Sequence, residues 1–182
     1  MTKRERTRRR LLECALDLFE QQGFGATTVS QIAAAAGVTP MTFFRHFAAK
    51  ENVLLDDPYD PLIVAAVAGQ PRSLPALFRV TGGIRTAWAQ LPEPDSDLVR
   101  RRVRIAATTP SLRSAAAANS GQTERLIVSA LVGDGVAPLA AQAAAAATMA
   151  AITAALFEWA TEPDLTLADA VGIVLDVLEG AV

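Results

Sequence analysis

Residues 27–50 read TTVSQIAAAAGVTPMTFFRHFAAK, and this stretch decides the fold. Thr28 and Gln31 have the spacing of a capping box, in which each side chain bonds the other residue's backbone amide. Gly37 stands where a left-handed residue turns the chain after a helix. Thr39-Pro40 then supplies an N-cap and the favoured first helical residue. The stretch therefore predicts a helix-turn-helix.

Helical spacing gives these two helices an apolar inner face and a polar outer face. The inner positions are Val29, Ile32, Ala33, Ala36, Phe43 and Phe47. The outer positions of the second helix are Met41, Thr42, Arg45 and His46, with Pro40 at its tip and Phe44 between the faces. Arg45 is the main candidate for a specific base contact, because a guanidinium can bind guanine O6 and N7 together. A simple phosphate contact is the alternative for Arg45, and a structural hydrogen bond is the alternative for His46.

A basic helix is expected before this stretch, at residues 6–22. Its apolar stripe is Leu12, Ala15, Leu16 and Phe19, and it would complete a three-helix head. Its opening turns carry the run Arg8-Arg9-Arg10. Phosphate contact, or an arm in a minor groove, is favoured for this run over a solvated surface.

From residue 9 to residue 54 the sequence closely resembles the DNA-binding domain of TetR-family regulators. It has their basic helix, TTV, IA and AGV segments, a threonine followed by two aromatic residues, and Lys50-Glu51. The resemblance implies a homodimer that places one recognition helix per subunit in successive major grooves of a near-palindromic operator. The DNA-contacting positions that it implies are Thr28, Ser30, Thr39, Pro40, Met41, Thr42, Phe44, Arg45, His46 and Lys50. Among these, Thr28, Ser30 and Lys50 would bind phosphate.

Two positions depart from the family pattern. Met41 stands where a small residue is usual and would add an apolar contact to a thymine methyl. Phe44 replaces a common tyrosine and so lacks a hydroxyl for a phosphate.

The charges are divided along the chain. Residues 1–50 hold eight basic and four acidic residues, whereas the other 132 hold nine basic and fifteen acidic ones. A positive head on an acidic body is typical of a nucleic-acid-binding head. Cys14 is the only cysteine, so the chain has no internal disulfide.

The remaining sequence predicts a larger helical body, so that residues 1–50 form the head and residues 51–182 a ligand-binding and dimerisation domain. The fold class is all-α, with about nine helices. Pro58 and Pro61 interrupt the link to the body and indicate either a hinge or a fixed kink. A turn is expected at 92–94. Gly82-Gly83 lies inside a helix expected at 74–91, where a close approach or a cavity would offset the cost of two glycines.

The run Arg100-Arg101-Arg102 cannot share one helix face. A solvated surface is favoured for it over an anionic ligand or an acidic neighbour. TPSLR at 109–113, together with these arginines, faintly resembles the C-terminal domain of the mycofactocin-associated, acyl-coenzyme A-responsive TetR group. That resemblance implies an acyl-coenzyme A-like anion as one alternative for the ligand, a hydrophobic molecule being the other.

The last two helices, at 138–160 and 165–178, are expected to form a homodimer interface, because alanine lets helices approach closely. Residues 136–157 carry no charge and are long enough to span a bilayer. Their alanine content favours a packed helix, and hence a cytoplasmic protein without a membrane partner.

The sequence favours a ligand-released transcriptional repressor over an enzyme or a helical protein-interaction module. It has one histidine, one cysteine and one tyrosine, and no metal-ligand spacing, phosphate-cradling glycine loop or nucleophile motif. No cofactor or metal is therefore expected. The candidate ligand pocket residues are Phe78, Trp88, Arg104 and Phe157.

Overall fold

The structure is a computed structural model that describes residues 2–56, 59–90 and 97–181. Within these ranges all regular structure is helical, which confirms the predicted fold class. The helices are α1 (Lys3–Gln22), α2 (Val29–Ala35), α3 (Pro40–Phe44), α4 (Asn52–Leu55), α5 (Asp60–Ala68), α6 (Ala76–Trp88), α7 (Asp97–Thr108), α8 (Pro110–Gly133), α9 (Pro138–Thr161) and α10 (Leu167–Glu179). α4 is a single turn. Pro58 and the turn expected at 92–94 lie outside the described residues.

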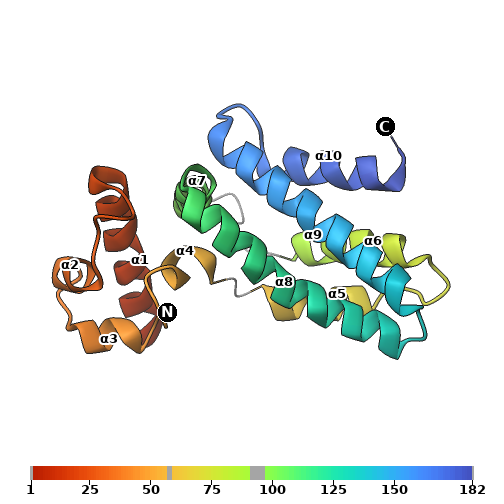
Figure 1. Ribbon diagram of the computed structural model, residues 1–182, viewed down its shortest axis with the longest axis horizontal. Helices are drawn as coiled ribbons and strands as arrows, with labels where there is room; N and C mark the ends of the chain where they lie inside the picture. The colour runs from red at the N-terminus through yellow and green to blue at the C-terminus, as the bar shows by residue number, and fades with distance from the viewer. Residues whose placement is uncertain (1, 57–58, 91–96, 182) are drawn as a thin grey trace.

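Helices α1, α2 and α3 gather at one end of the molecule, and α5, α6, α8, α9 and α10 form the larger group at the other end (Figure 1). The short α4 and the start of α8 lie between the two groups, and α7 packs against both α1 and α9. One apolar cluster fills the three-helix end. It includes Leu11, Leu16, Ile32, Phe43 and Phe47, each at most 2% exposed.

The local signals of the helix-turn-helix are all present. Thr28 and Gln31 form the predicted capping box on α2. Gly37 has φ of +65°, the left-handed conformation that its place after α2 requires. The Thr39 side chain accepts a hydrogen bond from the Thr42 amide, and Pro40 begins α3. The predicted inner residues Ile32, Ala33, Ala36, Phe43 and Phe47 are buried, and Val29 is half-buried.

Helix α9 is the central element of the body. It packs against α6, α7, α8 and α10, and it buries Ala141, Ala144, Ala145, Ala155 and Trp159. By length and composition α9 could cross a membrane. Of its most apolar 18-residue segment, 39% is buried inside the protein. Its packing against four helices favours a core helix, as the sequence predicted.

The glycine pair of α6 marks a close approach between helices. A Cβ atom built on Gly83 would lie 2.5 Å from Val67 Cγ2 and 2.7 Å from Val67 Cα in α5. No side chain fits at that separation, so the close approach offsets the intrinsic cost of a helical glycine. The buried residues of α6 are Arg79, Val80, Thr81, Gly83, Ile84 and Ala87. Phe78, a candidate pocket residue, is 42% exposed.

The three adjacent arginines of α7 bind three different parts of the protein, so the solvated surface favoured from the sequence is wrong. Arg100 donates to the carbonyl oxygens of Trp159, Glu162 and Leu165 at and beyond the end of α9. Arg101 lies 2.6 Å from carboxylate oxygens of Asp17 and Glu20 in α1, the acidic neighbours that the sequence left as the alternative.

Arg102 faces the short link between the head and the body. Its Nε donates to the carbonyl oxygen of Leu54 at 3.1 Å, and its Nη2 donates to that of Asp56 at 2.9 Å. Successive residues of a helix point about 100° apart, which is why one run of arginines reaches α9, α1 and α4.

Candidate nucleic-acid interface and effector cavity

Helix α3 presents its outer side to solvent. Met41 is 71% exposed and Phe44 is 51% exposed, although both are large apolar side chains. Arg45 directly follows α3 and is exposed, as is Pro40 at the other end. Phe43, between them in sequence, is fully buried and packs edge-on against Phe44 at a ring-centroid distance of 5.6 Å. The buried ring therefore anchors a short helix whose opposite side is available to a partner.

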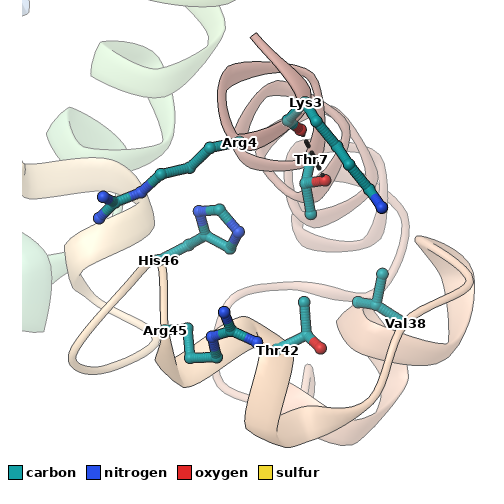
Figure 2. Close-up of a pocket in the computed structure, with 7 residues that line it drawn as sticks. All are labelled: Lys3, Arg4, Thr7, Val38, Thr42, Arg45 and His46. Carbon is teal, nitrogen blue, oxygen red and sulfur yellow. Dashed lines mark hydrogen bonds between the residues drawn. The ribbon is translucent and has the colours of Figure 1, made fainter.

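A basic crevice of about 770 Å³ separates the start of α1 from α3. Figure 2 shows Lys3, Arg4 and Thr7 on one side, facing Val38, Thr42, Arg45 and His46 on the other. Lys3 and Arg4 were missed among the predicted contact residues. Their place in the basic opening of α1 was visible in the sequence, but the run at 8–10 drew the prediction instead. The crevice combines cations from two helices on one surface.

The imidazole of His46 lies in this crevice. Burial lowers its pKa from the ordinary value of 6.5, and the positive charges of Arg4, Arg8 and Arg45 lower that pKa further. His46 is therefore neutral at neutral pH, and one of its ring nitrogens can donate a hydrogen bond while the other accepts one.

Arg8 and Lys50 are half-buried, and both bind backbone carbonyl groups of the head. Arg8 donates to the His46 carbonyl oxygen at 2.7 Å, forms an ion pair with Asp56 at 3.2 Å, and stacks over the ring of Phe47. Lys50 donates to the carbonyl oxygens of Phe24 and Thr27, each at 2.7 Å. Both cations therefore hold the helix-turn-helix together.

The remaining predicted positions divide by accessibility. Thr28 and Ser30 are exposed at the start of α2, although the Thr28 hydroxyl is engaged by Gln31. Thr42 is half-buried, with its hydroxyl 3.1 Å from that of Thr39. Of the run at 8–10, Arg9 pairs with Glu13 along α1 and Arg10 is exposed.

A second cavity, of about 220 Å³, lies inside the body. Of the candidate pocket residues, Trp88 and Phe157 line this cavity, whereas Phe78 and Arg104 do not and are exposed. Most of its wall is apolar. The polar side chains on the wall are Tyr59, Asp60, Arg102, Asn119, Ser120, Thr123 and Thr153. Sequence reasoning missed these polar residues, because helices α5, α7, α8 and α9 bring them together only in the folded chain.

The polar part of the wall is internally bonded. Thr123 donates to the Asp60 carboxylate at 2.6 Å, and Asn119 donates to the carbonyl oxygen of Leu55 at 3.0 Å. The described residues contain no group of three or more His, Cys, Asp or Glu side chains that could hold a metal ion.

An exposed recognition helix beside a basic crevice, with a separate helical body, defines a class of helix-turn-helix DNA-binding proteins. Two family models match this chain: bacterial regulatory proteins of the tetR family over residues 11–56, and the MftR C-terminal domain over residues 74–182. The chain therefore belongs to the TetR family of transcriptional regulators, with a C-terminal domain of the MftR type.

Relatives of similar sequence are regulators of the same kind. The chain is 38% identical over 117 residues to the HTH-type transcriptional regulator TcmR of Streptomyces glaucescens, which covers 60% of this chain and 52% of that protein. It is 44% identical over 49 residues to the HTH-type transcriptional regulator AcrR of Shigella flexneri, covering 27% of this chain and 23% of that one. The chain thus matches about half, or less, of the length of these relatives.

Solved structures share the fold over nearly the whole chain. SmeT, the repressor of the Stenotrophomonas maltophilia multidrug efflux pump SmeDEF, superposes with a TM-score of 0.61 at 19% identity, covering 96% of this chain and 89% of that one. NalD, the secondary repressor of the MexAB-OprM multidrug efflux pump in Pseudomonas aeruginosa, gives 0.56 at 21% identity, covering 97% and 95%. At these identities the likeness concerns the fold.

Proposed function

We propose that this protein is a cytoplasmic, homodimeric transcriptional repressor that binds a near-palindromic operator and is released from it by a small molecule. Residues 1–50 would form the DNA-binding domain, and residues 51–182 the ligand-binding and dimerisation domain. The observation that carries the proposal is the outer side of α3, where Arg45, Met41 and Phe44 are exposed beside a basic crevice. Family membership and the repressors of the same fold support it.

The two parts of this surface suit the two parts of DNA recognition. Lys3 and Arg4 carry charges that attract phosphates without regard to sequence. Arg45 can bind guanine bidentately, while the thioether of Met41 offers an apolar contact to a thymine methyl. Thr28, Ser30, Thr39, Pro40, Thr42, Phe44 and His46 are proposed as further contacts. Lys50 is proposed to act by holding the chain between α1 and α2 in place for them.

Dimerisation is proposed to use α9 and α10. On α9 the exposed residues Leu139, Ala143, Ala147, Ala150 and Ala154 lie on one helical face. On α10, Ile173 is 54% exposed and Val177 is 59% exposed. Small residues on one helix and large apolar residues on the next are suited to close packing against a second copy.

The effector is proposed to enter the cavity of the body. A volume of about 220 Å³ is below the ~300–1,000 Å³ that is usual for ligand pockets. This favours a compact hydrophobic ligand over an entire coenzyme A thioester, of which only the acyl part would fit.

A mobility-shift titration tests the DNA-binding proposal. Fragments around the protein's own gene are titrated with wild-type protein and with Arg45→Ala at two salt concentrations. We expect sequence-selective binding that weakens with salt, and a loss of ~1–3 kcal/mol in the variant.

A second function, a helical protein-interaction module, is favoured only by the exposed Met41 and Phe44, which would also suit a protein partner. It would be supported if no fragment bound selectively and if Arg45→Ala left the principal activity unchanged.

A further inference from the structure

Two side chains of the body hold three consecutive carbonyl oxygens of the link to the head. Arg102 of α7 donates to the carbonyls of Leu54 and Asp56. Asn119 of α8 donates to the carbonyl of Leu55, which lies between them in sequence. The three donor–acceptor distances are 3.1, 2.9 and 3.0 Å. We call this arrangement the carbonyl clamp.

The clamp acts where the backbone needs partners. Helix α4 ends at Leu55, and the last carbonyl groups of a helix have no N–H donor within that helix. Because α4 has only four residues, its carbonyls depend on outside donors more than those of a long helix do. Arg102 and Asn119 supply these donors from the body, so they fix the end of the link.

The same two side chains line the effector cavity, together with Leu54 and Leu55 themselves. A ligand in the cavity therefore touches the donors and the segment that they hold. A ligand with an acceptor oxygen near Arg102 and Asn119 would compete with the carbonyls of the link for the same N–H groups. A ligand that is only apolar would fill the cavity beside Trp88 and Phe157 without this competition.

The link in turn contacts the recognition end of the head. The Asp56 carboxylate, whose residue carries one of the clamped carbonyls, pairs with Arg8 at 3.2 Å. Arg8 donates to the His46 carbonyl oxygen at 2.7 Å, just beyond α3. A shift of residues 54–56 therefore pulls on the side chain that supports the end of the recognition helix.

We propose that the carbonyl clamp is the device through which the effector releases DNA, and that the effector is a largely apolar molecule bearing a carbonyl or carboxylate oxygen that takes the donors of Arg102 and Asn119. This inference rests on the proposed function, since it assumes that the head binds DNA and that the cavity binds the effector. It assigns Arg102 and Asn119 as positioning residues for the head.

The first test removes each donor separately in the full-length protein. Asn119→Leu keeps the side chain's size, and Arg102→Met keeps an unbranched, flexible side chain, while both lose the N–H groups. Thr148→Val is the matched control, because Thr148 is buried in α9 outside the cavity lining and its hydroxyl donates to Ala144 of its own helix. Hydrogen exchange of the backbone amides at 52–56 is the readout, with thermal melting to verify folding.

We expect exchange at the amides of Leu55 and Asp56 to be about tenfold faster in both clamp variants than in wild type or Thr148→Val. Affinity for a bound DNA fragment should fall in the same two variants without any ligand. If these amides exchange at the wild-type rate in folded Asn119→Leu and Arg102→Met proteins, the proposed role of the clamp is wrong.

The second test uses three probes of nearly the same shape: 2-acetylnaphthalene, 2-naphthoate and 2-ethylnaphthalene. Binding is followed by quenching of tryptophan fluorescence, since Trp88 lines the cavity. We expect the ketone or the carboxylate to bind and to accelerate exchange at 54–56, and the hydrocarbon to bind without doing so. Equal acceleration by the hydrocarbon, or no binding of either oxygenated probe, would overturn the assignment of the ligand class.

The exchange readout separates this inference from the proposed function, since it needs no DNA. If the clamp variants exchange faster but no DNA fragment is bound by wild type, the DNA-binding proposal fails while the clamp stands. If wild type binds DNA and the clamp variants bind it equally well, the clamp fails as the releasing device while the proposed function stands.

Discussion

At the scale of single residues, the charged side chains of the head divide between internal support and outward contact. Arg8 and Lys50 donate to backbone carbonyls, whereas Arg45 is exposed. Sequence patterns predicted the apolar half of the head well, because burial of Ile32, Phe43 and Phe47 follows from helical spacing alone. They could not predict which cations turn inward, since a long flexible side chain reaches acceptors many residues away.

The lowered pKa of His46 predicts a pH dependence of DNA binding. In the free protein, burial and the neighbouring arginines disfavour the imidazolium form. Phosphates at the crevice would offset those positive charges and raise the pKa of His46 again. At a pH below 6.5, the ordinary pKa of histidine, the complex with DNA therefore takes up a proton at His46. Affinity should therefore rise as the pH falls from about 7.5 to about 5.5.

Fluorescence anisotropy at constant ionic strength measures this effect, with His46→Gln as the comparison. The variant should lose the part of the pH dependence that His46 contributes. The sign for folding is opposite: because the folded pKa is lowered, acidification through 6.5 protonates the unfolded chain first and reduces stability. An affinity that falls on acidification equally in both proteins would contradict the prediction.

At the scale of helices, local signals determined where α2 and α3 begin and where the chain turns between them. Capping at Thr28, the turn at Gly37 and the start at Pro40 involve residues within a few positions of each other, and the structure confirms each. The orientation of α6 was less predictable. Its sequence allows two partly apolar faces, and the close approach to α5 at Gly83 selects the one that leaves Phe78 exposed.

Gly83→Ala should therefore destabilise the protein. The new Cβ would meet backbone as well as side-chain atoms of Val67, so α5 and α6 must separate, at a cost of roughly 1–3 kcal/mol. Gly121→Ala in α8 is the control, because its nearest neighbour would be the end of the Arg125 side chain at 3.6 Å. That change should be neutral or stabilising by up to about 1 kcal/mol.

Urea unfolding of both variants decides the matter. A Gly83→Ala protein as stable as Gly121→Ala would show that the two helices are not held at this separation.

The ion pairs of Arg101 predict a coupling between α7 and α1. They raise the pKa of the Arg101 guanidinium, and its side chain is only 18% exposed. Asp17 and Glu20 are about half exposed, so the pairs should contribute less than about 1 kcal/mol each to stability. Their main role is expected to be orientation of the head.

Arg101→Glu should accordingly weaken DNA binding about tenfold while changing the melting temperature little, because like charges would push α1 away from α7. Adding Glu20→Arg restores an attractive pair and should recover most of the affinity. Titration of one labelled DNA fragment with the two variants provides the comparison, and failure of the second change to restore binding would argue against this role.

At the scale of the whole molecule, the proposed dimer face can be tested apart from the DNA. Ile173→Asp places a charge in the exposed apolar face of α10 and should convert the protein to monomers. Leu126→Asp is the matched control: Leu126 is 45% exposed but belongs to α8, which is not one of the two helices of the proposed dimer face. Sedimentation gives the mass of each variant.

Loss of the dimer should also weaken operator binding by roughly 10²–10⁴-fold, because the two heads no longer act at a high effective concentration. A monomeric Leu126→Asp protein, or an Ile173→Asp protein that stays dimeric, would show that the dimer interface lies outside the proposed face.

The arginine run of α7 has a consequence for exchanging domains between relatives. Arg101 recognises Asp17 and Glu20, and Arg102 recognises the backbone at 54 and 56. If a head is transplanted from another regulator together with its link through residue 56, an arginine at 102 can still hold the backbone of that link. Only a head with acids at positions 17 and 20 matches the arginine at 101. We therefore expect the function of a chimera to depend on the charges at positions 17 and 20 of its first helix, and not on the residues that read DNA.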